Sequence, residues 1–340
     1  MSRRVCGWTP RFLWAGLAIL LLVGTEAVQA QSLFETVGDP VPAEVERIYQ
    51  RGLKYLAAKQ DKNGGWPDNY GRQPGVIGLA MLAMLAHGED PSFGPYADNI
   101  KRCVGAIIKG QNKTNGYIGS SMYNHGFATL ALAEAYGVVQ DDRIGPALEK
   151  AVGLILSSQK SNAYGAWRYN PGSNDADTTV SGACMVALFA AQNAGVAVPE
   201  KAIERGVKYY TSCACPEGGF GYTSDSGPNA PRAAIGMLVY ALARRYQAKE
   251  LVRTLQWFKG NSGSSVSNHY YHYSLYYAAQ ALFQTDIAYW REWNDRNVKR
   301  LKQSQQADGS MNGNNGATFC TSASLLSLAL NYRFLPIYER

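Results

Sequence analysis

Residues 51–66 of this 340-residue chain read RGLKYLAAKQDKNGGW, and the same pattern returns further along the sequence. Residues 205–220 read RGVKYYTSCACPEGGF and align with the first stretch without a gap. Both stretches open on Arg-Gly, continue through Lys-Tyr, and end on a glycine pair followed by an aromatic residue. Weaker copies are GQNKTNGY at 110–117, a segment that holds Gln159 and Trp167, and QADGSM at 306–311. Self-similarity at this spacing predicts a repeat architecture.

Each repeat has the same order of segments. An amphipathic segment with apolar residues at helical spacing ends near a glutamine, and a glycine-rich turn follows. A second segment, richer in small and apolar residues, comes next. The pattern predicts six pairs of helices, at 44–60 with 74–87, 96–111 with 121–137, 146–159 with 178–194, 199–213 with 230–246, 249–259 with 269–284, and 290–305 with 317–332.

The second segments align with one another on small residues. One column reads Gly78, Gly126, Gly182, Gly236, Tyr276 and Ser322. Glycine inside a helix lowers its stability, so repeated use indicates close packing of helix backbones. We therefore expect the second segments to form an inner set and the polar first segments an outer set. Six similar hairpins without strand-type alternation predict an all-α fold that closes on itself, the (α/α)6 toroid.

The first 30 residues resemble an export signal rather than part of the fold. Arg3, Arg4 and Arg11 precede an apolar run at 12–24. Val28-Gln29-Ala30 then forms a small-residue cleavage site before Gln31. We expect a signal peptide at 1–30, an N-terminal arm at 31–43 and the toroid at 44–340. The mature protein would then be periplasmic or secreted, with no transmembrane span, and an uncleaved anchor is the alternative.

Charge and cysteine content exclude some classes of function. The formal net charge is +7, and the basic residues are scattered without a run, so nucleic-acid binding is not indicated. Cys103, Cys184 and Cys320 lie in apolar helical stretches and are expected to be buried packing residues. The remaining pair, Cys213 and Cys215, is not spaced like a disulfide framework.

The stretch RGLKYLAAKQDKNGGW resembles the QW repeat of the prenyltransferase/squalene oxidase repeat family. This family includes squalene–hopene cyclases and, in degraded form, the β subunits of protein prenyltransferases. The resemblance covers nearly the whole chain after the signal and implies the terpenoid cyclase-like α/α toroid. In the repeat itself, the glutamine is expected to bond backbone groups at a helix end, with the aromatic residue packed beneath.

Residues 175–179, DADTT, resemble the Asp-x-Asp-Asp-Thr acid motif of squalene–hopene-type cyclases. The resemblance places Asp177 at the proton donor and Asp175 beside it, while Thr178 replaces the last aspartate. Protonation of an alkene needs a carboxylic acid kept protonated by an apolar cavity. The alternative is that Asp177 is the N-cap of a helix and Asp175 a loop residue.

A second candidate region is NHYYHYSLYY at 268–277, at the start of an inner helix. His269, His272, Tyr273 and Tyr276 either line a pocket by stacking on a ligand or fill the axis of the toroid as core. His125 precedes Gly126 and is expected to share such a pocket. In the repeat alignment Thr178, Arg232 and His272 occupy equivalent positions, which we call one level of the ring. Because Asp177 directly precedes Thr178, we expect Asp177, Arg232 and His272 to form one polar rim.

Zinc is a weaker candidate. Cys213, Cys215 and a histidine are a possible ligand set, and a histidine in a Tyr-His stretch resembles a zinc ligand of protein prenyltransferases. The Cys-x-Cys pair lies in a different part of its repeat from the ligands of that family. We therefore expect no metal and no other cofactor.

Three functions follow, in order of preference. The first is a toroid that binds an apolar small molecule, a peptide or a glycan in its central cavity or on its face. The second is a squalene–hopene-cyclase-like isomerase with Asp177 as general acid. The third is a glycan-active enzyme using Asp175 and Asp177, ranked last because carboxylates two residues apart are awkwardly placed to flank a glycosidic bond.

Overall fold

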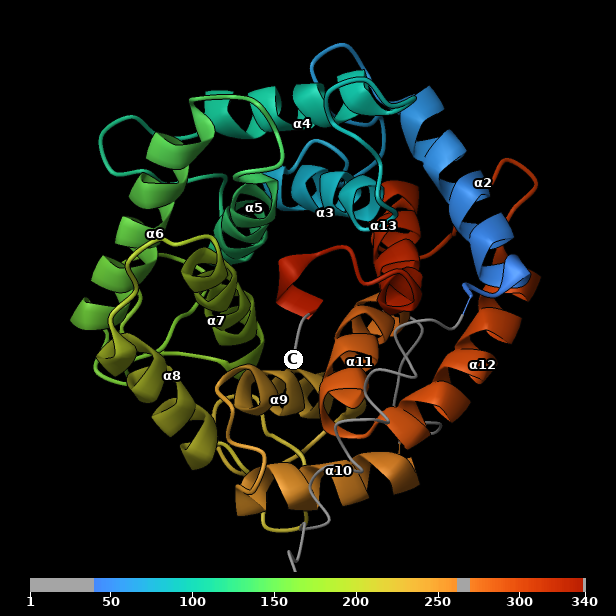
Figure 1. The fold of residues 1–340 in the computed structure, drawn as a ribbon. Coiled ribbons are helices and arrows are strands. Elements are labelled where there is room, and N and C mark those ends of the chain that lie inside the picture. The colour runs from blue at the N-terminus through green and yellow to red at the C-terminus, as the bar shows by residue number, and fades with distance from the viewer. Residues whose placement is uncertain (1–39, 262–269, 339–340) are drawn as a thin grey trace, which may run out of the picture. The chain divides into compact units, whose positions relative to one another are not determined.

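The computed structural model describes residues 40–261 and 270–338. The chain divides into two units at residue 40, and all that follows concerns the unit that begins at Val41. Its described part holds twelve α-helices and no named β-strand, arranged as two concentric rings (Figure 1). The predicted all-α (α/α)6 toroid is therefore confirmed. The predicted signal peptide at 1–30 and residues 31–39 of the predicted arm lie outside the described residues.

The two rings alternate along the chain. The outer ring contains α2 (Ala43–Lys59), α4 (Ala97–Lys109), α6 (Ile144–Ser161), α8 (Glu200–Ser212), α10 (Lys249–Asn261) and α12 (Ile287–Ser304). The inner ring contains α3 (Pro74–Leu85), α5 (Met122–Ala135), α7 (Thr178–Asn193), α9 (Ala230–Leu242), α11 (Tyr271–Thr285) and α13 (Ala317–Leu328). Helix α9 ends four residues before the predicted boundary, where Arg244 adopts a φ of 55° that no right-handed helix can continue.

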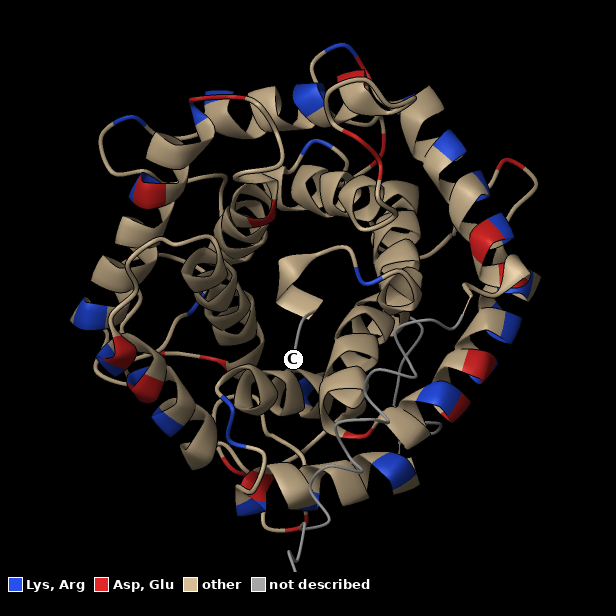
Figure 2. Cartoon of the chain, viewed as in Figure 1, with Lys and Arg blue, Asp and Glu red and all other residues tan. Residues whose placement is uncertain are grey.

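Charge separates the rings. Lysine, arginine, aspartate and glutamate lie mainly on the outer helices and the loops (Figure 2). The six inner helices contain only two such residues, Glu134 in α5 and Arg232 in α9. Nearly every other inner-helix residue is buried, so the core lies between the two rings and between neighbouring inner helices. A helix that is apolar all round must be covered on all sides.

The small-residue column explains how the inner helices fit together. A Cβ atom added to Gly126 would lie 3.0 Å from the backbone carbon of Ala183 on α7. At Gly182 the same atom would lie 2.2 Å from Ile235 on α9. Both distances are shorter than ordinary carbon contacts, so these glycines let adjacent inner helices approach closely. The packing reason predicted for this column is confirmed.

The glutamine of the repeat joins consecutive outer helices. Gln159 Nε2 donates to Gly165 O in its own turn at 2.9 Å and to Ala202 O in α8 at 2.8 Å. Gln60, Gln111 and Gln305 make the same pair of bonds, to the turn and to α4, α6 and α2 respectively. The predicted role of the glutamine is thus confirmed.

The turn glycine and the aromatic residue complete this joint. Gly64, Gly116, Gly165, Gly218 and Gly309 all have positive φ, between 68° and 106°. At Gly309 a Cβ would lie 2.2 Å from Arg51 O, so only glycine fits beside the next outer helix. Trp66 and Trp167 are fully buried and donate through Nε1 to Leu56 O and Ile155 O. In the copy at 110–117 the fully buried residue is Ile118, one residue past the tyrosine.

The ring closes between the last hairpin and the first. Gln305 Nε2 donates to Ile48 O at 2.9 Å, and Arg51 donates to Gln306 O at 2.6 Å. The chain then turns inward, and the short 3-10 helix η4 (Pro336–Tyr338) lies inside the inner ring (Figure 1). Gln284 donates to Tyr338 O, and Ile337 N donates to Glu134. This segment fills the end of the ring where the inner helices finish.

Between residues 40 and 338, leaving out 262–269, no helix is both long and apolar enough to cross a membrane.

The glutamine joint gives a stability prediction. Gln159→Ala removes both bonds of a side chain that is 1% exposed and leaves the turn carbonyl of Gly165 without its donor, whereas Ala202 O still accepts a helical bond within α8. We expect the free energy of unfolding to fall by about 2 kcal/mol, since a buried unsatisfied group costs about 1–3 kcal/mol. The exposed Gln50→Ala is the control and should change it by less than about 0.5 kcal/mol. Urea unfolding curves measure both, and equal losses would contradict the joint's role.

Candidate functional site

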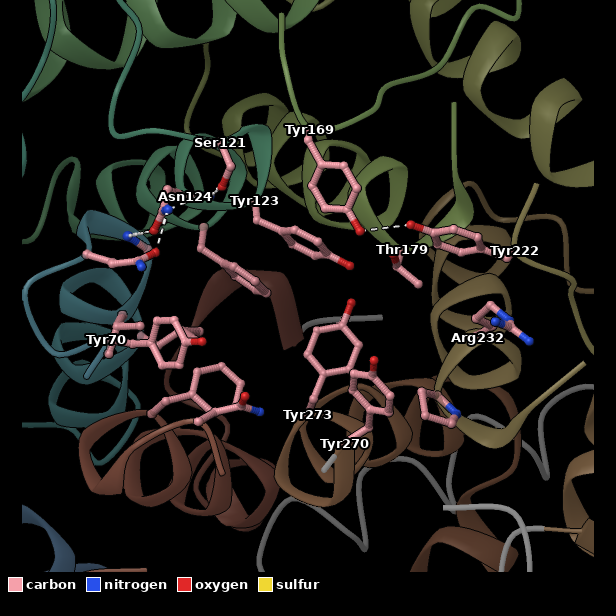
Figure 3. Close-up of a pocket in the computed structure, with 18 of the residues that line it drawn as sticks. Tyr70, Ser121, Tyr123, Asn124, Tyr169, Thr179, Tyr222, Arg232, Tyr270 and Tyr273 are labelled. Carbon is pink, nitrogen blue, oxygen red and sulfur yellow. Dashed lines mark hydrogen bonds between the residues drawn. The ribbon is translucent and has the colours of Figure 1, made fainter. Parts of the chain in front are cut away.

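A cavity of about 580 Å³ opens where the inner helices begin. All six inner helices contribute first-turn residues to it, including Val76, Tyr123, Thr179, Arg232, Tyr273 and Phe319. Because the helices run in the same direction around the ring, the cavity and the C-terminal segment lie at opposite ends of it. The described lining is mainly tyrosine and amide side chains (Figure 3).

Six tyrosines line the described part of the cavity: Tyr70, Tyr123, Tyr169, Tyr222, Tyr270 and Tyr273. The hydroxyls of Tyr169 and Tyr222 hydrogen-bond at 2.8 Å. Tyr123 and Tyr273 meet edge to face, with ring centroids 6.4 Å apart. Burial raises the pKa of both hydroxyls, so they are protonated and able to donate at neutral pH.

The amide side chains are fixed by the helix starts. Asn124 donates to Gln73 Oε1 at 2.7 Å and accepts from Gly75 N at 3.2 Å. Ser121 caps α5 by accepting from Asn124 N, and Asn229 caps α9 by accepting from Arg232 N. These contacts set the planes of the amide groups before any ligand arrives. The site is therefore pre-organised for hydrogen bonding.

Arg232 is the only charged side chain in the described lining. Its Nε donates to Phe220 O at 3.3 Å, one terminal nitrogen donates to Gly227 O, and the guanidinium lies 5.9 Å from the centroid of the Tyr222 ring. Burial lowers the pKa of Arg232 from its ordinary value, although an arginine remains charged at neutral pH.

Asp177 is the N-cap of α7. Its Oδ1 accepts from Thr179 N, Val180 N and Thr179 Oγ1, all within 2.8 Å, and the residue is fully buried. Arg168 lies 3.7 Å from Oδ2, and the same arginine pairs with the exposed Asp175 at 3.5 Å. Burial raises the pKa of Asp177, while the hydrogen bonds oppose that rise. Neither carboxyl belongs to the described lining, but Thr179, whose hydroxyl donates to Asp177 Oδ1, does.

The predicted histidines make contacts within the fold. His125 is fully buried, accepts from Ile118 N at 3.1 Å and bonds Ala151 O at 2.9 Å. His272 bonds Ser324 Oγ and Asn312 O, which places it between α11 and α13. Tyr276 packs against Phe127 and is also absent from the described lining. His269 lies outside the described residues, and Tyr273 lines the cavity as predicted.

The predicted rim of Asp177, Arg232 and His272 is therefore reduced to Arg232. The repeat alignment placed the residues of one level correctly but chose the wrong level. One residue further on, the column reads Gly75, Tyr123, Thr179, Ala233, Tyr273 and Phe319, and all but Ala233 line the cavity. Each step along an α-helix rotates the side chain by about 100°, so a shift of one residue moves it off the cavity face.

The sequence analysis missed most of the tyrosines. Tyr123 could have been found from the column that begins at Gly75, since it shares that column with Tyr273. Tyr70, Tyr169 and Tyr222 lie in loops before inner helices, where no period marks them. Their aromatic side chains after glycine-rich turns were the only available signal.

The cysteine pair is buried and unbridged. Cys213 and Cys215 are free thiols and both are buried. Burial raises the pKa of Cys215 to about 11, so it is a thiol at neutral pH. Among the described residues no three histidine, cysteine, aspartate or glutamate side chains are grouped to hold a metal ion. Whether the protein uses a cofactor stays at the level of a prediction.

Substitutions at Asp177 test its role as a cap. Asp177→Ala should lower the free energy of unfolding by about 2 kcal/mol, because three donors lose their acceptor. Asp177→Asn keeps an acceptor at the same place and should cost less than about 1 kcal/mol. Chemical denaturation of both variants makes the comparison, and equal losses would show that the charge rather than the cap matters.

His125 predicts a pH dependence. Burial lowers the pKa of His125 to about 4, against about 6.5 in an unfolded chain. Below pH 6.5 the imidazole is protonated in the unfolded state but not in the folded state. The free energy of unfolding therefore falls as the pH drops towards 4, by about 3 kcal/mol in total. His125→Asn keeps an acceptor for Ile118 N but does not titrate. The difference between the two proteins in urea unfolding should shrink from pH 7 to pH 4; a constant difference would contradict the prediction.

Solved structures with the same fold include enzymes of different chemistry. The GH76A α-1,6-mannanase from Salegentibacter sp. HEL1_6 matches with a TM-score of 0.66 at 9% identity, over 84% of this chain and 98% of that chain. Its inactive variant, with two aspartates replaced and α-1,6-mannotetrose bound, matches at 0.64 and 10% identity over the same shares. The type II terpene cyclase MstE from Scytonema, in complex with its product merosterolic acid A, matches at 0.59 and 12% identity, over 89% of this chain and all of that chain. At these identities the likeness shows the α/α toroid fold alone.

No curated protein sequence matches the chain. A family model described as a domain of unknown function, DUF6288, matches residues 45–226, from the second residue past the start of α2 to just beyond Tyr222. The match covers more than half of the chain and contributes four of the six cavity tyrosines. The protein therefore belongs to the DUF6288 family.

Proposed function

We propose that this protein is a saccharide-binding module whose cavity holds sugar rings between tyrosine rings and side-chain amides. The observation that carries the proposal is the composition of the lining: six tyrosines, four amide side chains and one arginine around about 580 Å³. That volume lies within the range of ordinary ligand sites, roughly 300–1,000 Å³. A sugar ring offers apolar C–H faces to aromatic rings and hydroxyls at its edge to amides.

The polar atoms of the lining favour a saccharide over a hydrocarbon ligand. Gln73, Asn124 and Arg232 all lie on the cavity wall, as do the hydroxyls of Thr179 and Ser121. A purely apolar ligand would strip water from these groups without replacing its hydrogen bonds, at a cost of about 1–3 kcal/mol for each group. A polyhydroxylated ligand replaces those bonds.

Binding without cleavage is favoured by the placement of the carboxyls. Glycoside hydrolysis ordinarily needs two carboxyl groups on either side of the scissile bond. In the described lining there is no carboxyl group, and Asp177 is already used by the start of α7. The mannanase neighbour, which is a glycan-active protein by its name, supports a saccharide as ligand but not its turnover here.

The second candidate is a cyclase-like isomerase with Asp177 as general acid. Burial raises the pKa of Asp177, which is the direction that this chemistry requires. The terpene cyclase neighbour and the resemblance of residues 51–66 to QW repeats support it as well. It ranks second because Asp177 does not line the described cavity. Loss of a terpenoid conversion in Asp177→Asn, with the fold intact, would favour it over binding.

The proposed location of the protein comes from its first 30 residues. The signal-like residues 1–30 support export, and we propose that the protein meets its saccharide outside the cytoplasm.

A tyrosine on the cavity wall tests the function. Tyr70 is 41% exposed, so Tyr70→Ala should leave the fold intact while it removes a stacking surface. We expect affinity for any bound oligosaccharide to drop about tenfold, as for a central aromatic contact. The matched control is Tyr136→Ala, a tyrosine that is 47% exposed and away from the cavity.

The measurement is a glycan array followed by titration calorimetry, with α-1,6-mannotetraose among the neutral probes. Absence of binding to every neutral and acidic oligosaccharide by the folded protein would overturn the proposal. Equal losses from Tyr70→Ala and Tyr136→Ala would move the binding site away from the cavity.

A further inference from the structure

The starts of the inner helices make the cavity electropositive. A helix carries roughly half a positive charge at its N-terminus, which proteins commonly offset with acidic residues in the first turn. The outer helices α2, α4, α8 and α10 have such residues, among them Glu44, Asp98, Glu200 and Glu250. None of the six inner helices has one. The positive ends of these helices therefore meet around the cavity with little compensation.

The two charged residues of the inner ring both oppose the helix dipole. Glu134 lies in the last turn of α5, at the negative end, and Arg232 lies in the first turn of α9, at the positive end. Each placement costs stability rather than adding it. Glu134 has a visible purpose, since it accepts from Ile337 N in the C-terminal segment. Arg232 has no comparable partner of opposite charge.

The contacts of Arg232 leave its charge unpaired. Its donors reach the carbonyls of Phe220 and Gly227, and no carboxylate in the described residues forms an ion pair with it. Its remaining terminal nitrogen, Nη1, makes no hydrogen bond within the described part of the chain. Half-burial of an arginine beside a helix N-terminus is costly unless an anion joins it.

Two acidic side chains at this end of the ring already bind helix starts. Asp177 accepts from the start of α7 and faces Arg168. Asp68 accepts from Gly71 N and from Thr318 N, which caps α13. Each carboxylate offsets the positive charge at the start of one helix, α7 or α13. The starts of α3, α5, α9 and α11 keep their positive charge.

A second observation points to a missing acceptor. The Tyr273 hydroxyl is buried and its residue is 9% exposed; the hydroxyls of Tyr123 and Tyr277 lie beside it, but among the described residues neither bonds it with good geometry. In Figure 3 its ring points into the cavity, with the hydroxyl towards Tyr123. Buried hydroxyls in folded proteins nearly always have a partner, so this one indicates a ligand group that accepts.

We propose that the ligand is an acidic saccharide whose carboxylate binds at Arg232, with Tyr273 donating a hydrogen bond to the same ligand. The inference rests on the proposed saccharide function and adds the charge of the ligand to it. A carboxylate on a sugar ring supplies the negative charge that the helix starts and Arg232 lack. The neutral remainder of the ring stacks on the tyrosines. Without the predicted signal peptide, which contains three arginines and one glutamate, the net charge is +5, and it also attracts an acidic polymer to the protein.

The experiment compares matched pairs of probes. Oligosaccharides of galacturonate, of alginate and of hyaluronate are each tested beside their carboxyl-reduced, neutral counterparts by titration calorimetry. We expect at least one acidic form to bind about tenfold more tightly than its neutral partner, because a hydrogen bond to a charged group is worth about 1.5–3 kcal/mol. The preference should weaken as salt rises.

Two variants locate the charge. Arg232→Gln should abolish the preference for the acidic form over its neutral counterpart, and Arg232→Lys should restore part of it. Arg168→Gln is the matched control, because Arg168 lies against the same Tyr222 ring, 5.1 Å from its centroid, without lining the cavity. It should keep the preference. Thermal melts confirm that each variant is folded.

The outcomes separate the two proposals. Equal affinity for acidic and neutral forms would overturn the acidic ligand and leave the saccharide function standing. A preference that survives Arg232→Gln would overturn the assignment of the carboxylate to Arg232. Binding of no saccharide at all by the folded protein would overturn the proposed function and this inference with it.

Discussion

The fold depends on one hydrogen-bonding joint, the glutamine amide that holds a turn and the next outer helix at once. A primary amide has two N–H donors, and in Gln159 each reaches a carbonyl from a different part of the chain. The joint fixes the distance between consecutive outer helices, and the glycine beside it allows them to touch. Where the copy at 205–220 carries Ala214 in place of glutamine, Gly219 N donates to Thr254 Oγ1 instead, so the contact between turn and next helix is kept by another atom pair.

This regular outer frame determines the cavity. Because the outer helices are evenly joined, the turns that follow them deliver every inner helix in the same direction. The starts of all six then converge at one end of the ring and their ends at the other. The C-terminal segment occupies the second end, with Ile337 held by Glu134. The cavity opens at the first end, and much of its chemistry comes from the residues in the first turns of the inner helices.

The architecture could be predicted from the sequence because the same hairpin pattern recurs six times along the chain. Apolar spacing located all twelve helices, and the small-residue column identified which of them are inner. The packing geometry repeats from one hairpin to the next, which made this possible. Gly126 and Gly182 are required because neighbouring inner helices approach closely there. The site was harder to predict. A rotation of one residue separates Thr178, which bonds backbone in the fold, from Thr179 on the cavity wall.

Loop residues limited the prediction further. Tyr169 and Tyr222 meet across the site through a hydroxyl contact between residues 53 positions apart, which no local pattern encodes. The DADTT motif predicts either a general acid or a helix N-cap at Asp177. The three bonds to Asp177 Oδ1 correspond to the N-cap.

Ring closure has a consequence for how the molecule comes apart. In an open array of hairpins, the terminal repeats have one neighbour each and fray first. Here the bonds from Gln305 to Ile48 and from Arg51 to Gln306 give the first and last hairpins two neighbours each. Losing any hairpin breaks two interfaces rather than one, so partial unfolding is costly everywhere around the circle. The toroid should behave as a single cooperative unit, and new chain ends placed in one of its outer loops would leave the same closed circle of contacts.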